Sequence, residues 1–360
     1  MEVKNESFRS ILNIKNVIRP ITERIDQLSK PKLPLITNHR MHSLNNKKSI
    51  LNSLKKQITI QETPKHKFCS ELYFNTPSLT CEAWGAFDGN TSEIILGKNY
   101  TTRREIASLT KIMTCYTVIQ LSRTLRIDMK SQFVVISKKA AYINGTKAEL
   151  ETGDKITVHD LLYGLMLPSG NDAALALSDF FGRLLFEKAY PNNLYAPHKV
   201  TKFFITEMNK NASLIGMKRT TYTNPHGLAD KDNKSTVLDL GLLTCVAMKD
   251  ELFRNIVKTP YYIGSGFDIN NETKEFEWAN RNLLLDKGFN GVKTGTTPTA
   301  GNCLCSSIER NGKFIIMIVL SAKSQKARFS ETKKLSNYLL SNYDGCRNDA
   351  NLSKLPSIVK

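Results

Sequence analysis

The stretch Ile106-Ala-Ser-Leu-Thr-Lys-Ile-Met-Thr-Cys-Tyr116 places Ser108 three residues before Lys111. Apolar residues return at helical spacing through residue 121 with no Gly or Pro between them, which predicts a helix. A spacing of three puts both side chains on one helix face. A serine becomes a good nucleophile when a base takes its proton, and a lysine acts as that base only when burial or a second cation disfavours its charge. The apolar surroundings supply the first condition.

The spacing by itself is weak, because it also occurs at Ser330 and Lys333 and elsewhere in the chain. Two further motifs downstream make it informative. Ser169-Gly170-Asn171 lies within a Leu-Met-Leu-Pro-Ser-Gly-Asn-Asp-Ala-Ala segment, and Lys293-Thr294-Gly295 lies within Gly-Val-Lys-Thr-Gly-Thr-Thr. In this order, S-x-x-K, S-x-N and K-T-G form the signature of penicillin-binding proteins and class A β-lactamases.

From about Glu82 to about Tyr343 the chain resembles the serine D-alanyl-D-alanine carboxypeptidases, the low-molecular-mass penicillin-binding proteins of peptidase family S11. The resemblance extends beyond the three motifs to segments at residues 83–88, 95–99, 223–228, 280–284 and 327–331. Gly170 is typical of the carboxypeptidases, whereas class A β-lactamases usually carry Asp there, so the peptidase branch is favoured. The implied substrate is a peptide with a C-terminal D-alanine.

The chemistry and the resemblance together assign the catalytic roles. Ser108 attacks a peptide carbonyl with Lys111 as general base, and water later hydrolyses the acyl-enzyme. The resemblance adds the backbone N–H groups of Ser108 and Thr296 as the oxyanion hole. Ser169 relays a proton to the leaving amine, and Asn171 holds either the Lys111 ammonium or the substrate amide.

The residues of the K-T-G segment and one arginine are candidates for substrate binding. Lys293 brings a second positive charge that lowers the proton affinity of Lys111 and attracts an anionic substrate. Thr294 and Arg328 match the geometry of a terminal carboxylate, although Arg328 can equally pair with Glu331 on the surface of a helix. Gly295 lets the strand approach the substrate backbone closely.

The histidines and cysteines indicate neither a metal site nor a cofactor. The seven cysteines do not form a metal-binding C-x-x-C arrangement, and His39 and His42 have no further ligands near them in the sequence. His226 looks like a catalytic imidazole, but within Asn-Pro-His-Gly-Leu it is expected to belong to a structural turn.

The fold class predicted is α+β, an antiparallel β-sheet flanked by helices with an inserted, mainly helical subdomain. A hairpin is expected at 81–87 and 93–96, and Ser169 and Asn171 on a tight loop between two helices. Helices are expected at 158–167, 173–186, 201–215, 237–248 and 327–340, and strands at 291–296, 302–309 and 313–321. This layout agrees with the β-lactamase/transpeptidase-like fold that the resemblance implies. The catalytic domain is expected to span residues 68–345, followed by a polar tail at 346–360.

The first 67 residues carry 14 Lys and Arg against five Asp and Glu, which gives +9 of the total net charge of +18. An apolar stripe at alternating steps of three and four runs from Ile11 to Leu28 and is interrupted by Pro20. Three interpretations remain open: a partly disordered basic arm, an amphipathic segment that contacts a membrane surface or a protein partner, and a targeting presequence, which the acidic residues oppose. Nucleic-acid binding is not expected, because no binding motif accompanies the charge.

Neither a secretory signal nor a run of about 18 apolar residues is visible in the sequence, so a cytoplasmic location is expected by default. This departs from the usual plan of the family, whose members are exported. The missing signal motivates one alternative to an active carboxypeptidase, a repurposed interaction protein on the same fold. A β-lactamase-like hydrolase is the alternative within the enzyme class. The oligomeric state is left open.

Overall fold

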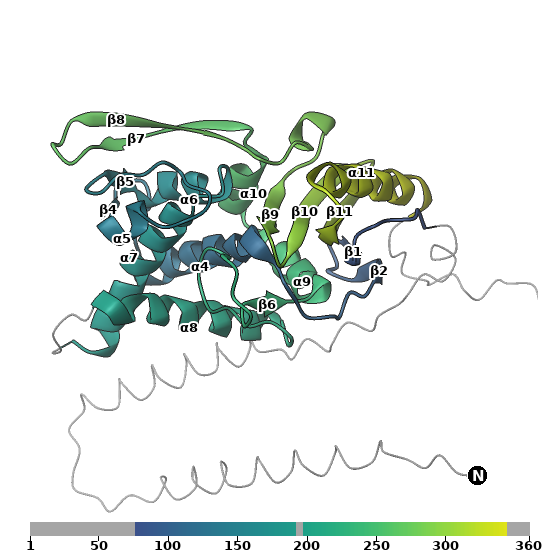
Figure 1. Ribbon diagram of the computed structural model, residues 1–360, viewed down its shortest axis with the longest axis horizontal. Helices are drawn as coiled ribbons and strands as arrows, with labels where there is room; N and C mark the ends of the chain where they lie inside the picture. The colour runs from purple at the N-terminus through teal and green to yellow at the C-terminus, as the bar shows by residue number, and fades with distance from the viewer. Residues whose placement is uncertain (1–75, 192–196, 344–360) are drawn as a thin grey trace, which may run out of the picture. The chain divides into compact units, whose positions relative to one another are not determined.

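A computed structural model describes residues 76–191 and 197–343, which form a five-stranded sheet with a group of helices beside it (Figure 1). The strand order is β2-β1-β11-β10-β9, and every neighbouring pair is antiparallel. The bounds are β1 Ala83–Asp88, β2 Ile94–Lys98, β9 Val292–Thr297, β10 Gly301–Arg310 and β11 Lys313–Ala322. The predicted N-terminal hairpin and the three predicted C-terminal strands are therefore confirmed, and they meet where β1 pairs with β11.

The sheet is buried on both faces because its strands alternate between two cores. On β11, Ile316 and Ile318 face the larger core, which includes α9 (Val237–Ala247), whereas Met317 and Val319 face a second core beneath α11 (Gln325–Asn342). Both helices contact β11. This packing fixes the plane of the sheet and leaves β9 as the edge strand that adjoins the helices (Figure 1).

The inserted part of the chain is mainly helical, as the sequence predicts. Its main helices are α4 Thr110–Leu125, α6 Val158–Met166, α7 Asn171–Ala189 and α8 Pro197–Ile215, with the short α5 Lys138–Ala141 and α10 Glu251–Lys258. Helix α4 is buried along most of its length and contacts α6, α7, α8 and α9. A 3₁₀ turn, η1 (Ala107–Leu109), precedes α4 and packs against β9. The start of α4 therefore lies where the helical part meets the edge of the sheet.

Two smaller sheets complete the fold. One joins β3 (Arg104–Glu105) to β6 (Lys234–Ser235), and the other has the order β4-β5-β7-β8. Its strands are β4 Phe133–Val135, β5 Lys155–Thr157, β7 Tyr261–Phe267 and β8 Thr273–Ala279, followed by a 3₁₀ turn η2 at Leu285–Lys287. The sequence pattern does not predict this sheet. On β7 the buried positions include Gly264 and Gly266, while Ile263 and Phe267 are exposed, so the usual hydrophobic alternation is inverted.

None of the helices within 76–191 and 197–343 has both the length and the apolar character needed to cross a membrane. The basic segment 1–67, the proposed domain boundary near residue 68 and the tail 346–360 lie outside the described residues, so these parts of the sequence analysis stay predictions.

Candidate active site

Ser108 and Lys111 meet at the junction of η1 and α4. Ser108 lies in the 3₁₀ turn just before the helix, rather than in the helix itself, and Lys111 lies in the first turn of α4. Lys111 Nζ is 3.0 Å from Ser108 Oγ, 2.7 Å from Asn171 Oδ1 and 2.5 Å from the carbonyl oxygen of His226. Its side chain is fully buried. The lysine is therefore enclosed by three oxygen atoms, one of which belongs to the candidate nucleophile.

Burial lowers the pKa of Lys111 from 10.5 to about 7. The carboxylate of Asp172 opposes this shift and the cation of Arg281 adds to it. A neutral amine has two N–H groups and one lone pair. When Asn171 Oδ1 and the His226 carbonyl accept the two N–H groups, the lone pair is left to face Ser108 Oγ. The arrangement thus suits proton transfer from the serine to the lysine.

The backbone around Ser108 is fixed by two glycines. Ala107 has a φ of 48°, in the left-handed region, so the turn needs close support. A Cβ atom on Gly227 would lie 2.0 Å from the Ala107 carbonyl oxygen, and a Cβ atom on Gly295 would lie 3.0 Å from Ser108 N. The close approach that Gly295 permits in this structure is therefore to the backbone of Ser108.

The Asn-Pro-His-Gly-Leu segment forms a turn, as expected. Asn224 Oδ1 accepts hydrogen bonds from the backbone N–H groups of His226 and Gly227, at 3.3 and 2.7 Å. The imidazole Nδ1 of His226 accepts from Leu228 N at 3.2 Å, and burial together with Lys111 lowers the His226 pKa to about 3. The imidazole is thus neutral and structural, while the carbonyl of the same residue contacts Lys111.

The S-x-N segment supplies one free hydroxyl and one fully engaged amide. Ser169 lies between α6 and α7 with a φ of 69°, and its Oγ is buried without a hydrogen-bond partner among the described residues. Asn171 is the first residue of α7, not a loop residue as predicted, and its Nδ2 donates to Asn144 O at 2.7 Å. Because Asn171 Oδ1 accepts from Lys111, the amide is held in place between the loop and the lysine.

Asp172, which the sequence analysis does not single out, holds the loop opposite α7. It is buried and accepts hydrogen bonds from the backbone N–H groups of Ala148, Leu150 and Ala173. The hydrogen-bonding capacity of the Asp172 carboxylate is therefore used by backbone N–H groups. The acid influences Lys111 through space without touching it.

The K-T-G strand, β9, forms the opposite wall. Thr294 and Thr296 line the cleft, but Lys293 is fully buried, is not a lining residue and donates from Nζ to the Thr294 carbonyl at 2.9 Å. Burial, followed by the charges of Lys111 and Arg281, lowers the pKa of Lys293 well below its usual value. For Lys111 the neighbouring cation that adds to burial is Arg281.

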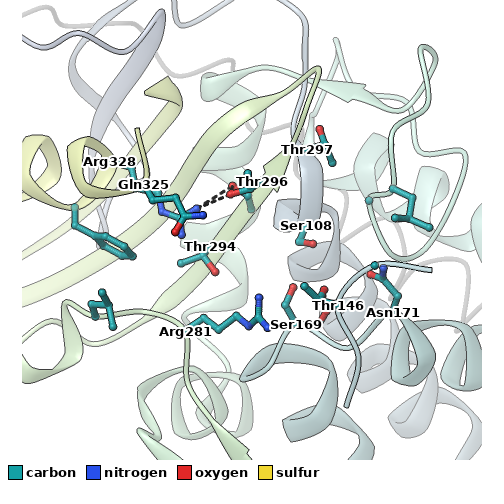
Figure 2. A pocket seen from close by; sticks show the side chains of 16 residues that line it. Ser108, Thr146, Ser169, Asn171, Arg281, Thr294, Thr296, Thr297, Gln325 and Arg328 are labelled. Carbon is teal, nitrogen blue, oxygen red and sulfur yellow. Dashed lines mark hydrogen bonds between the residues drawn. The ribbon is translucent and has the colours of Figure 1, made fainter. Parts of the chain in front are cut away.

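Arg328 is buried against the strand, so the predicted alternative of a surface pair with Glu331 is wrong. Its Nη1 donates to Gly295 O at 3.1 Å and to Thr296 Oγ1 at 2.9 Å (Figure 2). Glu331 is also buried and accepts hydrogen bonds from Thr80 N at 2.9 Å and Cys81 N at 3.2 Å. Both side chains lie on the buried face of α11, where Arg328 supports β9 and Glu331 fixes the chain before β1.

Arg281 is a further cleft residue, and in the sequence it stands out only as part of the family segment at 280–284. It is exposed, and Figure 2 shows its guanidinium directed into the cleft toward Ser169. Within residues 76–191 and 197–343 its side chain has no hydrogen bond or ion pair. Such a solvent-facing arginine beside a nucleophile is suited to bind a carboxylate.

These groups surround a cleft of about 430 Å³. Two arginines and no acidic residue line it, and the buried amines of Lys111 and Lys293 lie beneath its surface. In the described part of the chain no group of three or more His, Cys, Asp and Glu side chains is placed to hold a metal ion. The lining is shared by the two halves of the fold: Ser108, Thr146, Ser169 and Asn171 on one side and Arg281, Thr294, Thr296 and Arg328 on the other (Figure 2).

Comparison with known proteins identifies the family of this chain. The family model described as D-alanyl-D-alanine carboxypeptidase matches residues 71–183 and 199–324. A D-alanyl-D-alanine carboxypeptidase of Streptomyces sp. (strain K15) is 36% identical over 272 residues, 73% of this chain and 88% of the relative. D-alanyl-D-alanine carboxypeptidase DacF of Bacillus subtilis (strain 168) is 29% identical over 303 residues, 82% of this chain and 72% of the relative.

The solved structures agree with the sequence matches. The crystal structure of the Streptomyces K15 DD-transpeptidase superposes with a TM-score of 0.68 at 35% identity, over 74% of this chain and 99% of that chain. D-alanyl-D-alanine carboxypeptidase DacD of Francisella tularensis superposes with a TM-score of 0.64 at 28% identity, over 74% and 72% of the two chains. The predicted β-lactamase/transpeptidase-like fold is confirmed, and the chain belongs to the D-alanyl-D-alanine carboxypeptidase family, the serine peptidases of family S11.

Proposed function

We propose that the protein is a serine D-Ala-D-Ala carboxypeptidase that forms an acyl-enzyme on Ser108. The observation that carries the proposal is the position of Lys111: its Nζ lies 3.0 Å from Ser108 Oγ, and its pKa is lowered to about 7 by burial. A base whose pKa lies near neutral pH is both deprotonated often enough and basic enough to activate a hydroxyl. A lysine with an ordinary pKa would be protonated almost completely at that pH.

The reaction begins when Ser108 Oγ attacks the carbonyl carbon of the scissile peptide bond and Lys111 takes the serine proton. Charge then develops on the carbonyl oxygen. The backbone N–H groups of Ser108 and Thr296 are proposed to stabilise it, since Gly295 brings this part of β9 against the turn that carries Ser108. Fixed donors of this kind need no reorganisation as the charge appears.

The leaving amine needs a proton, and Ser169 is placed to relay it. Its buried hydroxyl has no partner among the described residues, which is costly unless a substrate or the leaving group fills the position. Lys111 then carries the proton taken from Ser108 and returns it through Ser169 to the amine. Water hydrolyses the resulting ester with Lys111 as base again.

The carboxylate of the terminal D-alanine is proposed to bind between Thr294, Arg281 and Arg328. Thr294 offers a hydroxyl in the cleft, and Arg281 offers a guanidinium without a partner in the described part of the chain. Arg328 already supports Gly295 and Thr296 through Nη1, so we assign it partly to positioning β9. Lys293 does not line the cleft, and its Nζ supports the Thr294 carbonyl from within the fold.

A fluorescent penicillin tests the proposal directly. The purified full chain, Ser108→Ala and Ser330→Ala are each incubated with the reagent, and covalent labelling is measured by gel and by intact mass. Ser330 also lies three residues before a lysine, but its side chain is exposed on α11, so it is a matched control. We expect labelling of the wild type and Ser330→Ala and none of Ser108→Ala. Release of D-alanine from an N-acyl-D-Ala-D-Ala peptide should follow the same pattern.

The alternatives predict different outcomes. A repurposed interaction protein would remain unlabelled although folded, as judged by circular dichroism. A β-lactamase-like hydrolase would be labelled but would lose the label within seconds, because its deacylation is fast. A long-lived label together with release of D-alanine supports the carboxypeptidase.

A further inference from the structure

A second hollow of about 490 Å³ adjoins the catalytic cleft. It lies between the segment around η2 and helix α11, and it shares Leu283, Gln325 and Phe329 with the lining of the cleft. The two spaces therefore adjoin each other at the protein surface. A ligand in the second hollow would also reach the catalytic cleft.

The chemistry of this hollow differs from that of the cleft. Its floor is apolar: Leu283 is 63% exposed, and Phe329 is half-buried beside it. Its rim is basic, and no acidic residue lines it. The lysines of the rim are Lys287, Lys326 and Lys333, all exposed and without an ion pair among the described residues.

Helix α11 presents these groups on one face. Lys326, Phe329 and Lys333 are separated by three and four residues, which places them in line along the helix. The Arg328 guanidinium, which belongs to the cleft, lies 4.8 Å from the centre of the Phe329 ring. The aromatic ring is thus the boundary between the two spaces.

The hollow lies on one particular side of the nucleophile. In Figure 2, Arg328 and Gln325 lie on one side of Ser108 and Asn171 lies on the other. Under the proposed function the carboxylate of the leaving D-alanine binds at Arg281, Thr294 and Arg328. The hollow therefore begins where a one-residue leaving group would end.

We propose, building on the proposed function, that this hollow is a subsite on the leaving-group side that binds an amine carrying an apolar side chain and an additional carboxylate. The apolar floor contacts the side chain, and Lys326 and Lys333 attract the carboxylate. The bound amine faces the acyl group on Ser108. The subsite determines which amines react with the acyl-enzyme or leave as product, while water also reacts with the acyl-enzyme.

The chemical step balances without a further reactant. The amine nitrogen forms an amide bond with the acyl carbon, the ester bond to Ser108 Oγ breaks, and the proton lost by the nitrogen returns to Ser108 Oγ. The reverse step releases the same kind of amine as a leaving group from a longer substrate. Both directions use the same contacts in the hollow.

The position of the hollow beside the cleft favours this occupant over a lipid surface. Exposed Leu283 with three lysines could also meet an anionic membrane, but Leu283 and Phe329 line both the hollow and the catalytic cleft. A flat membrane surface would not contact the residues that the hollow shares with the cleft. A small anionic amine uses the apolar floor, the basic rim and the shared wall together.

The acceptor preference of the acyl-enzyme tests the proposal. The full-length enzyme is acylated with an N-acyl-D-alanyl thioester in the presence of glycyl-leucyl-glutamate or glycyl-leucyl-glutamine, and aminolysis and hydrolysis products are quantified by mass spectrometry. We expect about a fivefold preference for the glutamate tripeptide at low salt, the size given by exposed ion pairs, and a smaller preference at high salt. Lys326→Gln/Lys333→Gln should abolish the preference and leave hydrolysis of the thioester unchanged.

A matched control separates the subsite from bulk charge. Lys323→Gln/Lys334→Gln removes the same charge from exposed positions near or on the same helix that do not line the hollow. The preference should survive in this variant. Equal loss in both double variants, or no preference in the wild type, would overturn the subsite.

Binding without chemistry keeps the subsite and the catalytic proposal separate. Calorimetric titration of Ser108→Ala with each tripeptide should show the same preference, and the Lys326/Lys333 substitutions should remove it. Absence of acylation with retained tripeptide preference would refute the catalytic proposal alone. Normal acylation without tripeptide preference, or lysine-dependent binding only to phosphatidylglycerol vesicles, would refute the subsite alone.

Discussion

The pH dependence of acylation is the most direct consequence of the environment of Lys111. If neutral Lys111 takes the proton from Ser108, the rate of acylation by a penicillin follows the fraction of lysine that is deprotonated. We expect the second-order rate constant to rise about tenfold per pH unit below pH 6 and to level off above pH 8, with a midpoint near the Lys111 pKa of about 7.

The magnitude follows from the shift. With the ordinary pKa of 10.5, about three lysines in ten thousand are neutral at pH 7, whereas with a pKa of about 7 half of them are. Burial of Lys111 therefore raises the concentration of the active base by roughly a thousandfold at neutral pH. Three oxygen atoms surround the nitrogen, and two of them are fixed by the fold, so the gain does not require the lysine to move.

Rapid-quench labelling with a fluorescent penicillin between pH 5 and 10 measures this profile. Lys111→Arg is the control, since it keeps a cation in the site that does not deprotonate in this range, and circular dichroism establishes that both proteins are folded. It should label at least a thousandfold more slowly at every pH. A wild-type rate that keeps rising to pH 10 would show an ordinary lysine, and a flat rate from pH 5 would show that another group is the base.

Three further substitutions test the surroundings of the nucleophile. The folded-state pKa of Lys111 is depressed below 10.5, so the unfolded chain binds more protons than the folded chain between pH 7 and pH 10. In urea titrations, the free energy of unfolding of the wild type should therefore rise across this window by about 3 to 4 kcal/mol relative to that of Lys111→Met. Parallel pH profiles of the two proteins would contradict the shift. Arg281→Gln should shift the pH midpoint of acylation upward, because the Arg281 charge lowers the Lys111 pKa, and should raise KM for a peptide with a free carboxylate. Arg281→Lys keeps the charge, so its pH midpoint and KM should stay close to those of the wild type. An unchanged midpoint and KM in Arg281→Gln would exclude Arg281 from the site. Gly227→Ala should lower the free energy of unfolding by more than about 2 kcal/mol and slow acylation, because the new Cβ would clash with the Ala107 carbonyl. The control is Gly216→Ala, where φ is 90° but no atom lies within 4 Å, and it should lower the free energy of unfolding by about 1 kcal/mol. Equal effects of the two substitutions would refute the steric explanation.

Much of the site could be predicted because its chemistry requires particular residue types at short, recognisable spacings. Ser108 and Lys111 are three residues apart, and helical periodicity around them indicates burial. The S-x-N segment lies at the start of α7 and the K-T-G segment lies within β9, two elements that hydrophobic patterns predict to within two or three residues. The long-range contacts of the site were predicted only through the resemblance to a family.

Other features depend on tertiary contacts that leave no local pattern. Arg281 enters the cleft from a segment without regular structure, and the carbonyl of His226 is a backbone group that any residue could supply. The burial of Arg328 depends on β9 and β10, which come before it in sequence but beside it in space. The sheet containing β7 was missed because its exposed face is apolar and its buried face carries glycine.

The choice of a neutral partner for Lys111 explains how the site keeps its base active. A carboxylate in contact with the amine would stabilise the ammonium and raise its pKa, so the lysine would remain protonated at neutral pH. Asn171 contacts Lys111 through an uncharged oxygen, while the adjacent Asp172 is directed to the backbone amides of residues 148, 150 and 173. The acid thus contributes to the fold of the loop at a distance from the base. Because Arg281 and Arg328 line the cleft and no acidic residue does, an anionic substrate is the group that best neutralises its positive charge. Recognition of the substrate carboxylate is therefore linked to the same absence of acids that keeps the base active.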